Sequence, residues 1–148
     1  MANKYFNLVK KLLDMQKTTQ TFETVTRKCR LLSAQEGKIT VEFDVDESMT
    51  NHFGTMHGGC SAALTDELTS VALMATPKGI SGVTTDLHVT YLGPAKLGET
   101  IQVDAEVVRN GKSLAFTKAF FYRQKDSAPV AVGSHTMAFA VKHVANKE

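Results

Sequence analysis

The sequence predicts an α+β fold in which one antiparallel sheet is covered by one long, buried helix. The second half of the chain alternates apolar and polar residues between tight turns, which is typical of antiparallel strands with one buried face. A single apolar helical segment, rich in small residues, lies in the middle of the chain. The length of 148 residues suits one domain, residues 1–148, with a core large enough to need no metal or disulfide.

A first helix is expected over residues 3–21. Its apolar residues recur at helical spacing, namely Tyr5, Leu8, Val9, Leu12 and Leu13. The segment is also basic and poor in acid, which is compatible with a mitochondrial targeting peptide. The first arginine is Arg27, however, and Asp14 interrupts the basic face. An ordinary packing helix is therefore the preferred interpretation.

A strand and the central helix come next. Residues 39–45 alternate apolar and polar positions after a turn signal at Glu36 and Gly37. The central helix is expected over residues 59–76, and Pro77 and Gly79 end it. Its apolar residues fall on one face at steps of three and four, namely Leu64, Leu68, Val71, Ala72 and Ala75.

Four strands are expected in the remainder of the chain, over residues 83–91, 101–107, 112–122 and 130–141. Asn110 and Gly111 predict a two-residue type I′ hairpin turn between the second and third of these strands, since that turn requires positive φ at both centres. Order and pairing together favour a single sheet whose apolar face the central helix covers.

Composition excludes several classes of function. Hydrophobic residues make up 43% and charged residues 22% of the chain, as in ordinary folded proteins. A net charge of +2 without a basic run argues against a nucleic-acid partner. Cys29 and Cys60 have no metal-ligand spacing and are expected to be reduced thiols of an intracellular protein. No apolar run reaches the ~18 residues that a transmembrane segment needs.

The segment from Asn51 to Asp66 is the most informative part of the sequence. A polar loop leads through His57 into Gly58 and Gly59, where the helix begins, and the helix then carries Asp66. Backbone N–H groups at a helix start favour negative charge, and a carboxylate further along can act as an acid or base. An anion-stabilising helix start with a positioned base is what acyl-transfer chemistry requires.

Four segments resemble the small hotdog-fold acyl-coenzyme A thioesterases, namely residues 51–66, 82–86, 91–99 and 111–116. The resemblance extends over about residues 22–138. It implies a hotdog fold, in which the sheet wraps around the central helix, with the helix of residues 3–21 as an addition. It also implies homodimers joined through their sheets, commonly paired again into tetramers, with active sites shared between subunits.

The resemblance also implies roles for particular residues. Asp66 of one subunit would act as general base or nucleophile, while the other subunit would contribute Asn51, His57 and the Gly58 N–H. Thr84 stands where relatives commonly carry a serine that helps to hold the attacking water. Some relatives use a histidine where the alignment places Ala138, so that contact is not assigned. Residues lining the coenzyme A site would be Tyr91, Arg109, Asn110, Gly111, Lys112, Ser113 and Leu114. No metal or other cofactor is implied.

Each of these residues also has a purely structural interpretation. Asp66 and Glu67 could be solvated surface acids, and His57 could do no more than cap the helix. Asn51 is of a type common in turns, and Thr84 is a good strand residue. The glycines could serve only the turn, and cations beside a hairpin are often solvated.

The sequence therefore predicts an acyl-coenzyme A thioesterase, which hydrolyses its substrate to free acid and coenzyme A in the cytosol or the mitochondrion. Two rivals remain open. One is a hotdog dehydratase or hydratase, which moves protons at carbon rather than adding water to the carbonyl. The other is a sensor that binds acyl-coenzyme A without hydrolysing it.

Overall fold

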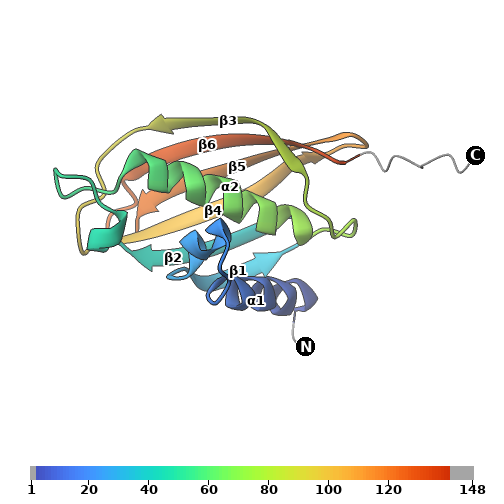
Figure 1. Ribbon diagram of the computed structural model, residues 1–148, viewed down its shortest axis with the longest axis horizontal. Coiled ribbons are helices and arrows are strands. Elements are labelled where there is room, and N and C mark those ends of the chain that lie inside the picture. Colours follow the sequence, from blue (N-terminus) through green and yellow to red (C-terminus); the bar gives the residue numbers. More distant parts are fainter. Residues whose placement is uncertain (1–2, 141–148) are drawn as a thin grey trace, which may run out of the picture.

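The computed structural model describes residues 3–140 as one sheet, one long central helix and a shorter N-terminal helix (Figure 1). The helices are α1 (Lys4–Gln16) and α2 (Gly58–Met74), with short 3₁₀ turns η1 (Phe22–Thr26) and η2 (Glu47–Met49). The strands are β1 (Arg30–Gln35), β2 (Lys38–Asp44), β3 (Val83–Tyr91), β4 (Thr100–Asn110), β5 (Leu114–Arg123) and β6 (Pro129–Ala138).

The six strands form one antiparallel sheet in the order β1-β2-β4-β5-β6-β3. Helix α2 lies across one face and contacts every strand from β2 to β3 in that order, while α1 packs beside β1 (Figure 1). Strand β3 forms the opposite edge of the sheet. The predicted α+β architecture, with a sheet around one central helix and an additional N-terminal helix, is confirmed.

Helix α2 is buried because its sheet-facing side is apolar and small. Leu64, Leu68 and Val71 have no exposed surface. The helix also approaches β6 very closely at Gly133, where an added Cβ would lie 2.4 Å from the Thr65 Cγ2 atom. Close approach of this kind fixes where along the sheet each residue of α2 lies, which positions the side chains described below.

Helix α1 packs on the fold as expected, but it ends earlier than the predicted residue 21. Val9 and Leu13 are buried, and Asn3 caps the helix by accepting the Tyr5 N–H at 3.0 Å. Beyond Gln16, Thr19 Oγ1 contacts Thr21 Oγ1 at 2.9 Å. Threonine side chains that bond locally compete with the helical backbone, which explains the early end.

Two features of the strands differ from the prediction. Strand β1 was not predicted, because Leu31 and Leu32 are adjacent and its side chains are mostly exposed, so no alternation marks it. Strand β6 ends at Ala138, so the predicted strand is too long at Phe139 and Ala140, and its last predicted residue, Val141, lies outside the described residues.

The predicted type I′ turn at Asn110 and Gly111 is wrong. Neither residue has a positive φ angle. The Gly111 N–H instead donates to the Leu114 carbonyl at 2.9 Å, and β5 begins at Leu114 rather than at residue 112. Strand β4 ends at Asn110, so residues 111–113, one more than a two-residue turn, close the hairpin. A register shift between Val107 and Arg109 precedes this loop.

Within residues 3–140, no helix is both long enough and apolar enough to cross a membrane.

Candidate active site

The first turn of α2 presents an open backbone donor. His57 is the N-cap residue, and its Nδ1 atom accepts the Gly59 N–H at 2.9 Å. His57 therefore caps the helix, and the ring proton belongs on Nε2 when the ring is neutral. The Gly58 N–H has no acceptor among residues 3–140 and is left available to an anion at the helix start.

Tyr91 explains why the first helical residue is glycine. Its hydroxyl donates to the Gly58 carbonyl at 2.7 Å. A Cβ built on Gly58 would lie 3.0 Å from the Tyr91 ring, so a side chain there would push the ring away. Tyr91, predicted to line the coenzyme A site, therefore supports the start of α2 as well.

Asn51 holds the preceding loop together. Its Oδ1 atom accepts the Phe53 N–H at 2.9 Å and the Thr55 N–H at 3.3 Å, and its Nδ2 atom donates to Thr55 Oγ1 at 3.1 Å. These bonds match the turn interpretation. They leave one amide hydrogen of Asn51 unused among the described residues.

Asp66 lies in the third turn of α2, on the side that faces β3 and β6. The residue is half-buried, and its carboxylate has no hydrogen-bond partner among residues 3–140. Its charge acts on the imidazole of His135, which places the two groups in one electrostatic environment. A carboxylate that is partly desolvated and uncommitted is well suited to accept a proton from water.

His135 is a site residue that the sequence reasoning missed. It is 1% exposed, and its two ring nitrogens contact Thr69 Oγ1 at 2.7 Å and Thr84 Oγ1 at 2.9 Å. The alignment had placed the relatives' histidine at Ala138. A usable signal was present in β6, because His135 alternates with Gly133 and Met137 on the face that turns toward α2.

The hydrogen bonds around His135 define the direction of each proton. Thr69 donates its hydroxyl to the Thr65 carbonyl at 2.7 Å, so it can only accept from His135 Nδ1. His135 Nε2 is then unprotonated and accepts the Thr84 hydroxyl. The Thr84 oxygen keeps its lone pairs, which can accept a further hydrogen bond.

Burial keeps His135 neutral. It lowers the pKa of His135, and the charges of Asp66 and Asp86 act in the opposite direction. A neutral imidazole is required for the proton arrangement above, because an imidazolium has no acceptor to offer Thr84.

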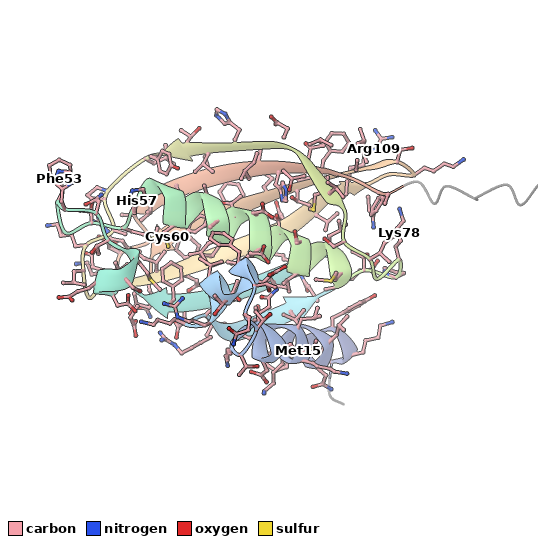
Figure 2. All side chains as sticks on the ribbon, in the orientation of Figure 1. Met15, Phe53, His57, Cys60, Lys78 and Arg109 are labelled. Carbon is pink, nitrogen blue, oxygen red and sulfur yellow. The ribbon has the colours of Figure 1, made fainter. Side chains whose placement is uncertain are left out.

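The predicted site residues fall into three groups that do not meet within one chain. Gly58 and Asp66 are eight residues apart on α2, about 12 Å along the helix axis. The hairpin of residues 109–114 lies at the other end of α2, where Asn110 Nδ2 donates to Thr76 Oγ1 at 3.4 Å. Figure 2 shows His57 and Arg109 at opposite ends of the molecule.

Glu67, next to Asp66, faces the N-terminal region instead of β3. Gln16 Nε2 donates to its Oε2 atom at 3.5 Å. Burial, together with the charges of Asp66 and Glu23, raises the pKa of Glu67 to about 7. The folded chain therefore holds this proton more tightly than the unfolded chain does, and the free energy of unfolding falls as pH rises from about 4.3 to 7.

Replacing Glu67 by glutamine removes the carboxylate that is costly to ionise. We expect the melting temperature of Glu67→Gln to exceed that of the wild type by about 3 °C at pH 8 and to equal it at pH 4.5. Thermal unfolding followed by circular dichroism at both pH values measures this. Glu47→Gln changes an exposed position in η2, and its melting temperature should differ from that of the wild type by the same amount at both pH values. If the melting temperatures of Glu67→Gln and the wild type differed by the same amount at both pH values, ionising the buried Glu67 carboxylate would have no cost in stability.

Among residues 3–140, no three His, Cys, Asp or Glu side chains lie close enough together to hold a metal ion.

A sheet around one helix, with an open N–H and a half-buried carboxylate on that helix, defines a hotdog protein equipped for acyl-transfer chemistry. The chain belongs to the thioesterase superfamily, whose family model matches residues 53–141. The resemblance found in the sequence is thereby confirmed at the level of the family.

Relatives of this chain include proteins with an assigned activity. Acyl-coenzyme A thioesterase 13 of Homo sapiens is 42% identical over 127 residues, which cover 86% of this chain and 87% of the relative. The crystal structure of zebra fish thioesterase superfamily member 2 has a TM-score of 0.89 and 34% identity, and the match covers 95% of this chain and 100% of that one. A Streptococcus mutans structure bound to acetyl CoA has a TM-score of 0.73 and 25% identity, and the match covers 83% of this chain and 94% of that one.

Proposed function

We propose that this protein hydrolyses acyl-coenzyme A to free acid and coenzyme A. The observation that carries the proposal is the pairing, on one helix, of an open N–H at Gly58 with the half-buried carboxylate of Asp66. The similarity to acyl-coenzyme A thioesterase 13 supports the choice of substrate.

Two copies of the chain form each active site in this proposal. Strand β3 is a sheet edge of nine residues, most of them exposed, and Val83 is 64% exposed. A long, uncovered edge of this kind is a template for pairing with another strand. A two-fold axis beside β3 turns the partner's α2 antiparallel, so that its Gly58 end approaches the Asp66 of the first subunit.

The thioester carbonyl lies between the two subunits. The Gly58 N–H of one copy stabilises the negative charge that develops on the carbonyl oxygen, with the unused amide hydrogen of Asn51 and the His57 Nε2–H close to the same helix start. Asp66 of the other copy removes a proton from water as the water oxygen adds to the carbonyl carbon. The C–S bond then breaks, and the thiolate of coenzyme A takes up that proton.

Thr84 orients the attacking water. Because its hydroxyl donates to His135 Nε2, its oxygen accepts one hydrogen of the water while Asp66 accepts the other. The lone pair of the water then points at the carbonyl carbon. In the alternative route, the Asp66 carboxylate attacks the carbonyl carbon and the C–S bond breaks, which leaves an anhydride and the thiolate of coenzyme A. Water then hydrolyses the anhydride to the free acid and Asp66, and the thiolate takes up the proton that is released.

The nucleotide part of coenzyme A lies against the hairpin of residues 109–114, while Tyr91 lines the part of the site at the start of α2. Arg109 and Lys112 bring positive charge to that hairpin, which suits phosphate groups. The dimers pair again into a tetramer. Both cysteines are free thiols, which favours an intracellular location in the cytosol or the mitochondrion.

A thiol-release assay across a series of saturated acyl-coenzyme A substrates tests the activity. Free coenzyme A should appear in proportion to time and enzyme, and the series identifies the preferred acyl length. An enoyl-coenzyme A assayed in parallel should show no hydration of its double bond. Hydration without thiol release would indicate a hydratase, and tight binding with neither reaction would indicate a sensor. Either result would overturn the proposal.

A further inference from the structure

Three carbonyl oxygens at the tip of the β4–β5 hairpin, those of Gly111, Ser113 and Leu114, accept hydrogen bonds from donors of the same chain. The Gly111 oxygen accepts from Lys78 Nζ at 2.8 Å. The Ser113 oxygen accepts the Phe139 N–H at 3.0 Å, and the Leu114 oxygen accepts the Gly111 N–H at 2.9 Å. These donors offset the partial negative charge of those three oxygens.

The donors at the same tip are uncommitted. The backbone N–H groups of Lys112 and Ser113 have no acceptor within residues 3–140, and both residues are exposed. The Ser113 hydroxyl likewise makes no hydrogen bond to the part of the chain that the structure describes. Uncommitted donors beside the cations of Arg109 and Lys112 favour an anion at the tip.

Lys78 produces this arrangement from outside the hairpin. It follows α2, and its ammonium lies 3.9 Å from the centroid of the Phe139 ring while it donates to Gly111. The Asn110 amide bonds Thr76 of the same segment at 3.4 Å, so the segment and the tip are joined at two points. Figure 2 shows Lys78 and Arg109 at the same end of the molecule.

We infer that Lys78 is a positioning residue for the phosphate-bearing nucleotide end of coenzyme A. It covers the Gly111 carbonyl, which would otherwise repel a phosphate, and it holds the tip so that the Lys112 and Ser113 N–H groups face outward. This inference rests on the proposed function, because it assumes that coenzyme A is the ligand at the hairpin. Lys78 acts through the tip and adds positive charge there.

The test compares two thioesters of the same acyl group, one of coenzyme A and one of pantetheine, which lacks the nucleotide and its phosphates. Lys78→Met should raise KM for the coenzyme A ester about tenfold, the loss expected for one charge-assisted hydrogen bond, with kcat unchanged. KM for the pantetheine ester should stay at the wild-type value. Lys78→Arg keeps the charge and a donor and should restore most of the affinity.

Lys125→Met is the matched control. Lys125 is exposed and pairs with Glu99 at 3.3 Å, close to the end of β4 opposite the hairpin. The substitution therefore removes one positive charge, as Lys78→Met does, but far from the hairpin. Its KM values should equal those of the wild type for both esters. Calorimetry with free coenzyme A adds a readout without turnover, in which Lys78→Met should bind about tenfold more weakly.

Two outcomes would overturn the role of Lys78: an unchanged KM and affinity for coenzyme A, or an equal rise in KM for both esters, which indicates general damage to the fold. Wild-type protein that binds coenzyme A but releases no thiol would refute the proposed hydrolysis instead. In that case the calorimetric comparison alone decides the role of Lys78.

Discussion

Asp66→Asn is expected to lower kcat by about 10³-fold, because the amide cannot take a proton from water and cannot attack the thioester. The change keeps the size and shape of the side chain, and Asp66 makes no hydrogen bond through its carboxylate within residues 3–140. The melting temperature should therefore stay close to that of the wild type. Steady-state thiol release, with coenzyme A binding measured separately, distinguishes lost chemistry from lost binding.

Glu67→Gln is the control for Asp66→Asn. It neutralises the adjacent acid on the same helix, on the side that faces Gln16 rather than β3. Its kcat should stay within a factor of about 2 of the wild type, as expected for a change outside the chemistry. Near-normal turnover by Asp66→Asn would refute the role of Asp66 as base or nucleophile.

Gly58→Pro is expected to lower kcat by about 10² to 10³-fold relative to Gly58→Ala, the usual effect of losing one oxyanion donor. Proline removes the N–H that the thioester oxygen would contact. The first position of a helix tolerates proline, because its N–H has no partner in the helix. His57, with φ −66° and ψ 134°, already has the extended backbone that a residue before proline prefers.

Gly58→Ala separates the N–H from the side chain. Both variants add a Cβ against the Tyr91 ring, but alanine keeps the donor. Burst and steady-state thiol release for the two variants give the comparison. If both lose the same activity, displacement of Tyr91 would explain the loss, and the Gly58 N–H would have no catalytic role.

Local patterns in the sequence were sufficient for the elements that carry the site. The apolar spacing from Leu64 to Val71 identified α2 and placed Asp66 on it, and strict alternation identified β3. Helix starts and glycine pairs are also local, which is why the donor at Gly58 was predicted from the segment around it.

The parts that were missed depend on residues far apart in the sequence. His135 contacts Thr69 and Thr84, which are 66 and 51 positions away, and this requires the register of β6 against both α2 and β3. The hairpin tip failed as a type I′ turn for a similar reason, since Lys78 and Phe139 bond it from outside. The sequence next to His135, or next to the hairpin tip, does not show which distant residues these parts contact.

The most direct test of the account is activity in a mixed dimer. Asp66→Asn and Gly58→Pro subunits, co-expressed with different tags and purified as the heterodimer, should recover about half of the wild-type activity, because one of the two sites combines an intact Asp66 with an intact Gly58. A heterodimer of a wild-type subunit and the double variant should be inactive, because each of its two sites then lacks either Asp66 or the Gly58 N–H. An inactive heterodimer of the single variants, with half activity in the second pairing, would place both groups in one subunit and contradict the account.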